Sequence, residues 1–389
     1  MSDSTAATAQ ELAPPAPRAR RGQNGLLSAL AGMAVGGGGA LLVLKMLPAL
    51  GESTLAAVRA QYGPWTLPVI VPLALFLAFA VIAVHEAGHV AAGVAAGMRF
   101  SLFAAGPLRI DRDPGTGRIA VRFNRTPAFW GGVAGCIPPD GNRIRQRLAW
   151  LVGGGPGASL LLAAMAGGLA LGVPLPPLAR FAAGMLGALS AAIGLATLIP
   201  MRTGGFMSDG GRLLRLVRGG PAAERDAAAL ALVARANVGE APREWPRELV
   251  EASTELRDDT LEESMAWIFA YYHRLDAGDR VAAGRAMHRA MELLDRWPAP
   301  LVPAVQAEAA YFAARSGDRD SARAHLAAIP ARTASVKAYD RDRALAALAL
   351  TDGDPVEAAA LAQKAMDALP PNTPFAAARL REIIDETTA

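Results

Sequence analysis

The chain of 389 residues has 52% hydrophobic residues, a net charge of +4 and a mean hydropathy of +0.25. Charged residues are scarce before residue 201 and frequent after residue 219, which predicts one part in a lipid bilayer and one in water. Aromatic residues make up only 6% and no basic stripe accompanies them, which argues against nucleic-acid binding. The single cysteine, Cys136, excludes a disulfide framework and a cysteine-based zinc site.

Residues 1–24 form a polar arm rich in Ala and Pro that contains the run "RARR". This composition predicts a disordered cytoplasmic arm. The alternative is a signal peptide, but the apolar run that follows is long and leads into further apolar stretches.

Four stretches are long and apolar enough to cross a bilayer, which takes about 20 residues. They are residues 26–50, 67–98, 148–173 and 178–201. Arginines gather in the N-terminal arm, after the second stretch and after the fourth, whereas the first loop holds only Arg59. Because Lys and Arg stay on the cytoplasmic side, we expect a multi-pass protein with both termini in the cytoplasm. High Ala, Gly and Arg content favours a bacterial inner (plasma) membrane.

The second stretch contains His85, Glu86 and His89 in the pattern H-E-x-x-H. On a helix, residues four apart share one face, so both imidazoles can bind one metal ion, usually zinc. Glu86 can then take a proton from a water at that metal. The alternative is a chance match or a structural histidine pair. Ionisable groups at membrane depth are costly and usually functional, which favours the metal site. The other histidines, His273, His288 and His325, are expected on the surface.

The loop at residues 99–126 holds "RFSLFAAGPLRI" and "RIAVRF" on either side of "DRDPGTG". Two β-rich runs around a turn signal predict a cytoplasmic β-hairpin. A solvated connector without strands is the alternative.

Asp209 is the expected third metal ligand. No Asp or Glu occurs between Gly141 and Ser208, and Asp209 follows the fourth stretch, near the side to which the second stretch delivers His89. Pro200 and neighbouring glycines can end the helix and turn the carboxylate toward a metal. The alternative is that Asp209 only caps a helix starting at Gly210.

The pattern of residues 219–389 predicts a soluble helical domain. Gly-Asp pairs at 278, 317 and 353 each separate two helical, Ala-rich runs. This recurrence resembles tetratricopeptide-like (TPR-like) repeats, for which a generic helical bundle is the alternative. Such repeats could recruit a protein partner, or the domain could only stabilise the protein.

His85-Glu86-Ala87-Gly88-His89 on one span, followed by Asp209-Gly210-Gly211 after a later span, resembles the site-2 protease family of intramembrane zinc metalloproteases (peptidase family M50). The resemblance covers residues 25–218, including "GGPGAS" at 154–159. It implies a zinc ion held by His85, His89 and Asp209, with Glu86 as the general base. The activity it implies is hydrolysis of a peptide bond in or near a transmembrane segment of a membrane-protein substrate.

The chain departs from this family at two positions. Thr197 and Ser159 stand where the family commonly has asparagines, which are thought to position substrate or order the site. Two other functions stay open. One is a non-catalytic membrane scaffold with a vestigial or structural zinc site, and the other is a metal transporter, although the spans offer few polar groups for a path.

Overall fold

The computed structural model describes residues 48–113, 116–124, 130–140, 142–203, 206–237, 239–299, 301–330, 336–370 and 373–388. Contacts divide the chain into two compact units. The N-terminal unit comprises residues 24–113 and 117–219, and the C-terminal unit contains residues 220–389. The predicted arm 1–24 and all but the end of the predicted span 26–50 lie outside the described residues.

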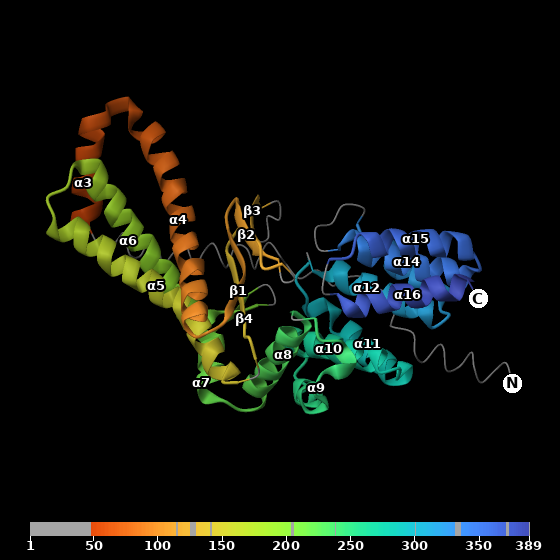
Figure 1. Ribbon diagram of the computed structural model, residues 1–389. Helices are drawn as coiled ribbons and strands as arrows, with labels where there is room; N and C mark the ends of the chain where they lie inside the picture. The colour runs from red at the N-terminus through yellow and green to blue at the C-terminus, as the bar shows by residue number, and fades with distance from the viewer. Residues whose placement is uncertain are drawn as a thin grey trace. The chain divides into compact units, whose positions relative to one another are not determined.

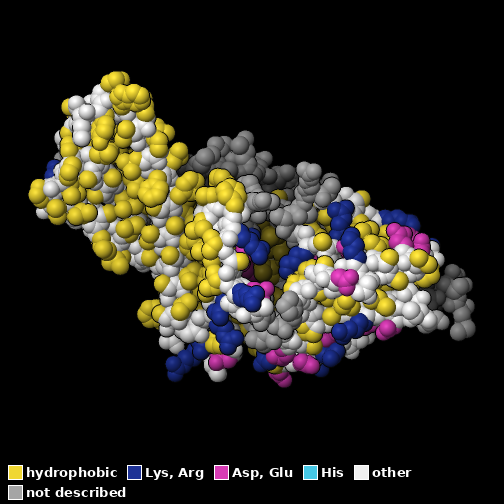
Figure 2. All heavy atoms as spheres, turned by 45° about the horizontal axis from the view of Figure 1, so that its top comes forward, with side chains coloured by type: hydrophobic (Ala, Val, Ile, Leu, Met, Phe, Trp, Pro, Cys, Tyr) yellow, Lys and Arg dark blue, Asp and Glu magenta, His cyan; other side chains and the backbone are white. Residues whose placement is uncertain are grey.

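Long helices make up most of the N-terminal unit (Figure 1). They are α3 (Pro48–Tyr62), η1 (Gly63–Trp65), α4 (Thr66–Ala95), α5 (Ile144–Gly172) and α6 (Pro177–Leu198). Among the described residues, three helical segments are long and apolar enough to cross a membrane: Ser53–Ala95, Ile144–Gly172 and Pro177–Leu198. Large apolar side chains such as Leu67 and Phe76 are exposed on α4. Hydrophobic side chains also cover most of the visible face of these helices (Figure 2).

Helices α4 and α5 cross where two glycines face each other. A Cβ atom on Gly88 would lie 2.4 Å from the carbonyl oxygen of Gly154, and one on Gly154 would lie 2.3 Å from that of Gly88. Small residues at both positions therefore let the two backbones approach closely. This approach occurs one residue before His89, so the histidine lies directly against the backbone of α5.

The segment after α4 forms an antiparallel sheet in the order β3-β2-β1-β4. The strands are β1 (Arg99–Ala105), β2 (Leu108–Arg112), β3 (Ile119–Phe123) and β4 (Val133–Ile137). The turn expected at "DRDPGTG" does join two antiparallel strands, β2 and β3. The hairpin expected over 99–126 is part of a larger sheet, because Gly106, at φ +51°, bends its first arm into two strands, β1 and β2. Strand β4 then pairs with β1 and enlarges the sheet.

The chain leaves α6 through β5 (Arg202–Thr203) and β6 (Phe206–Met207), a two-residue antiparallel pair. Helix α7 (Asp209–Arg218) follows at once and is the last element of the N-terminal unit.

The described part of the C-terminal unit is helical throughout. Its elements are α8 (Pro221–Asn237), η3 (Pro242–Glu244), α9 (Arg247–Thr254), α10 (Leu261–Asp276), α11 (Arg280–Glu292), η4 (Leu294–Arg296), α12 (Val302–Arg315), α13 (Arg319–Ala327), α14 (Ala338–Asp352), α15 (Pro355–Asp367) and α16 (Pro374–Thr388). Each Gly-Asp pair joins two of these helices. Gly278, Gly317 and Gly353 adopt positive φ at the turns, and the aspartate that follows each one caps the next helix.

Alanines and aromatic side chains form the core of the C-terminal unit, with Tyr271, Tyr311 and Phe312 almost fully buried. The surface position expected for His325 is wrong, since this side chain on α13 is completely buried. The histidine lies on the inner face of its helix, beside Ala322 and Leu326, which belong to the core.

Candidate metal centre

The two histidines of the H-E-x-x-H pattern lie one helical turn apart on α4. Both are buried, and their ring centroids are 4.9 Å apart. The spacing of four residues places the rings on one face of the helix, as the sequence predicts. Gly155 of α5 makes room for His89, because a Cβ atom there would lie 2.2 Å from the His89 Nε2 atom.

Asp209 reaches the histidines because a neighbouring serine caps its helix. Ser208 is the N-cap of α7, and its hydroxyl oxygen accepts hydrogen bonds from the backbone N–H groups of Gly211 and Met201. The same hydroxyl donates to the carbonyl oxygen of Ile199 at 2.7 Å and so ties the start of α7 to the end of α6. The alternative in which Asp209 caps the helix is therefore wrong, and its carboxylate is free for another role.

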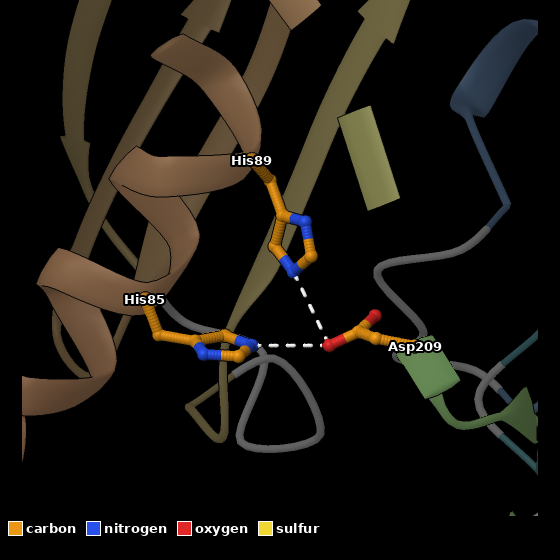
Figure 3. Close-up of side chains that lie close together, drawn as sticks. All are labelled: His85, His89 and Asp209. Atoms are coloured by element: carbon orange, nitrogen blue, oxygen red, sulfur yellow. Dashed lines mark hydrogen bonds and ion pairs between the residues drawn. The ribbon is translucent and has the colours of Figure 1, made fainter. Parts of the chain in front are cut away.

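His85, His89 and Asp209 converge on one point (Figure 3). The Asp209 Oδ2 atom lies 3.2 Å from the Nε2 atom of His85 and 3.5 Å from that of His89. Two ligands of a tetrahedral zinc ion, each bound at about 2.0 Å, are separated by roughly 3.3 Å. The three ligand atoms all lie within 4.8 Å of one another. This group could therefore hold a metal ion, with three protein ligands from two separate segments.

Hydrogen bonds on the far side of each ring direct Nε2 toward the centre. The Nδ1 atom of His85 is 2.9 Å from the Ser159 hydroxyl, and that of His89 is 2.8 Å from the carbonyl oxygen of Leu151. A carbonyl oxygen only accepts, so His89 carries its proton on Nδ1. The Gly155 N–H also lies 3.3 Å from this Nδ1 atom, but it would need an unprotonated nitrogen. With Nδ1 held by the shorter contact to Leu151, Nε2 is the nitrogen that faces the centre, where it can hold a proton shared with Asp209 or, once deprotonated, bind a metal ion.

The carboxylate and the two imidazole rings of the centre attract a positive charge. Burial alone would raise the pKa of Asp209, but hydrogen bonds with His85 and His89 outweigh it and lower that pKa to about 2. The carboxylate is therefore ionised and faces two ring nitrogens. The negative charge of the carboxylate can be balanced by protons on the rings or by one metal ion between the carboxylate and the ring nitrogens.

Glu86 lies beside the centre and against the start of β4. Its side chain is buried, and its carboxylate interacts electrostatically with His89 and Asp209. A Cβ atom on Gly132, one residue before β4, would lie 2.3 Å from the Glu86 Oε1 atom. The glycine at this position therefore leaves the space that the Glu86 carboxylate fills.

Ser159 and Thr197, the two expected substrate-positioning residues, have different surroundings. Ser159 is fully buried and contacts His85, so its visible role is to orient a metal ligand. The Thr197 hydroxyl donates to the carbonyl oxygen of Gly194 in its own helix. The contribution of either residue to substrate binding stays a prediction.

Three parts of the centre were missed by the sequence analysis: the Leu151 carbonyl, Gly132 and Ser208. A signal existed for Ser208, because Ser before Asp-Gly-Gly at a helix start is a common cap. Nothing local in the sequence pointed to Gly132.

No protein-family model, curated protein or solved structure matches this chain. The assignment of the centre therefore depends on its own geometry and chemistry.

Proposed function

We propose that the protein is an intramembrane zinc metalloprotease that hydrolyses a peptide bond in or near a transmembrane segment of a membrane protein. One observation carries the proposal. His85, His89 and Asp209 direct three ligand atoms to one point, with the carboxylate of Glu86 beside it. A site that only holds a metal for structural purposes has no need of this additional carboxylate beside its three ligands. The resemblance to the site-2 protease family supports the same function.

The ligand set fits zinc. Two neutral imidazoles and one carboxylate are typical of catalytic zinc sites, which keep one position open for water or substrate. A zinc ion held here would act as a Lewis acid that makes water more acidic and polarises the scissile carbonyl group.

Glu86 is the general base of the proposed reaction. Its carboxylate accepts a proton from the attacking water, whose oxygen forms the new bond to the carbonyl carbon. When the C–N bond breaks, the same carboxyl group returns the proton to the departing amine, so that Glu86 is regenerated. The buried position of Glu86 keeps this proton from exchanging freely with bulk solvent.

The free edge of β4 is the proposed binding site for the substrate backbone. A transmembrane helix must unwind before its peptide bonds can be attacked, and an extended segment can pair with an exposed strand edge. Among the described strands, β3 and β4 are the two edge strands of the sheet, and β4 begins one residue after Gly132, which lies against Glu86.

The proposed arrangement in the membrane has four crossings, with residues 26–50 as the first and both termini in the cytoplasm of a bacterial cell. His89 lies six residues before the end of α4, or about 9 Å along the helix axis. The centre would then lie near one boundary of the bilayer, where water can enter. The C-terminal helices would form a TPR-like recruitment domain.

Substitution of Glu86 by Gln tests the proposal. We expect the variant to keep its metal, because Glu86 is not one of the three ligands, and to cleave about 10²–10⁴-fold more slowly because the base is lost. The measurement uses full-length protein in lipid vesicles with a panel of tagged single-span membrane proteins, together with metal analysis. A wild-type protein that holds zinc but cleaves none of the panel, like E86Q, would support the non-catalytic scaffold instead.

A further inference from the structure

A cavity of about 700 Å³ lies in the C-terminal unit among α9, α10 and α11. It has no part in the metal centre, and its volume is within the range of ligand-binding pockets. Its lining includes five arginines and only three carboxylates: Arg247, Arg257, Arg274, Arg285 and Arg289, with Glu251, Asp279 and Glu292. The cavity is therefore strongly basic.

Two of these arginines are neutralised within the protein. Arg247 pairs with Glu251 at 2.7 Å. Arg289 pairs with Glu292 at 3.0 Å and also with Asp259 and Glu263, at 2.6 and 2.8 Å.

The other three arginines lack a carboxylate partner. Within the residues that the structure describes, Arg257, Arg274 and Arg285 have none within 4.0 Å. They come from three different segments: the loop after α9, helix α10 and helix α11. Three unneutralised guanidinium groups thus line one cavity.

Trp267 holds two of these guanidinium groups in place. The Cζ atoms of Arg257 and Arg274 lie 5.1 and 5.6 Å from the centroid of the Trp267 ring, which is a stabilising cation–π distance. Burial, followed by the charge of neighbouring Arg285, lowers the pKa of Arg274 from its ordinary value. The cations are therefore preorganised and repel one another, and a bound anion would relieve that repulsion.

We propose that this cavity binds an acidic peptide segment through Arg257, Arg274 and Arg285. The planar fork of a guanidinium group matches the two oxygens of an Asp or Glu carboxylate. Three such groups can each pair with a separate carboxylate along an acidic chain.

The start of α11 argues against a phosphate site. Helix N-termini bind phosphate through free backbone N–H groups. Here the carboxylate of Asp279 lines the cavity and already accepts a hydrogen bond from the Ala282 N–H at 2.8 Å. That N–H group is therefore not free to bind a phosphate in the usual way at this helix start. The proposal does not depend on whether the chain is a protease.

Fluorescence anisotropy with full-length protein in detergent micelles tests the proposal. The probe is a fluorescein-labelled hexaglutamate peptide with blocked ends, and the comparison peptide is hexaglutamine. We expect the acidic peptide to bind and hexaglutamine not to bind. The exposed variant Arg285→Gln should weaken binding about three- to fivefold, and the combined Arg257→Gln, Arg274→Gln and Arg285→Gln variant about tenfold or more.

Arg381→Gln is the matched control, because Arg381 is an exposed arginine on α16 outside the cavity. It should bind the acidic peptide with the wild-type affinity. Equal weakening by Arg285→Gln and Arg381→Gln would overturn the proposal, since binding would then reflect net charge alone. Displacement of the probe by inorganic pyrophosphate at lower concentrations than by unlabelled hexaglutamate would also overturn it, in favour of a phosphate-bearing ligand.

Discussion

Buried charged groups are treated differently in the two units of this protein. In the C-terminal unit, buried acids have basic partners: Glu308 pairs with Arg343, and Glu263 pairs with Arg289. In the N-terminal unit, Asp209 faces only the rings of His85 and His89 among the described residues. The C-terminal unit balances its buried charges internally, whereas the N-terminal unit leaves a position that a cation from outside can fill. A buried site without internal charge balance is therefore the stronger candidate for function.

The largest expected effect comes from removing a metal ligand. His85→Ala and Asp209→Ala should each reduce bound zinc from about one ion per chain to a small fraction of that, because two ligands hold zinc far less tightly than three. Adding zinc to metal-free wild-type protein should raise the free energy of unfolding by about 4 kcal/mol at a concentration 1,000 times the Kd. Elemental analysis and thermal denaturation provide the measurements. Equal zinc content in wild type and both variants would rule out this centre.

Breaking a charge pair in the C-terminal unit should affect stability and leave metal binding unchanged. Glu308→Gln leaves the buried guanidinium group of Arg343 with only the more distant carboxylate of Asp340, at 3.9 Å, which should cost about 3 kcal/mol of unfolding free energy. Denaturant unfolding followed by circular dichroism, with zinc content measured in parallel, checks this. If the variant were as stable as wild type, the contrast between the two units would lose its energetic basis.

Removing the hydrogen bond behind a ligand should have a smaller effect. Ser159→Ala removes the hydroxyl that contacts Nδ1 of His85, so the ring is less well oriented and zinc affinity should fall about tenfold. Ser190→Ala is the control, because this hydroxyl is also buried in an apolar helix but has no hydrogen-bond partner within the part of the chain that the structure describes. Competition with a zinc chelator measures both variants, and the role of Ser159 is refuted if they behave alike.

The smallest effect is expected from the outer end of the sheet. Deleting "DRDPGTG", residues 111–117, removes the turn between β2 and β3 and the last two residues of β2, but it removes no residue of β1 or β4, and β4 is the strand that begins beside Glu86. Cleavage of a model membrane substrate should change by less than about twofold if the substrate pairs with β4. A large loss of cleavage would instead place the substrate on the β3 side.

Local patterns predicted the features that depend on spacing along one helix or on one turn. The interval between His85 and His89 places them on one face of any α-helix, wherever that helix packs. The Gly-Asp pairs predicted the turns between helices, because glycine favours the positive φ found there and aspartate caps the following helix. Apolar length predicted α4, α5 and α6 to within a few residues.

Contacts between distant segments were not predictable in this way. The sequence "VAGCI" has no strong strand pattern, and β4 exists because β1 offers it an edge. His325 looked like a surface histidine, but the packing of α13 buries it. The contact between the Ser159 hydroxyl and Nδ1 of His85, 74 residues earlier in the chain, could not be predicted from the sequence either.

The sequence by itself determined the identity of the chemical groups and their local geometry: two imidazoles and a carboxylate on one helix, and an aspartate after a helix break. Only the tertiary structure decided that Asp209, 120 residues after His89, meets both rings, and that Ser159 and Leu151 orient them. The physical reason is that hydrogen bonding and steric preference act between near neighbours in the chain. Convergence across helices depends instead on close packing, here at the glycine contact between α4 and α5.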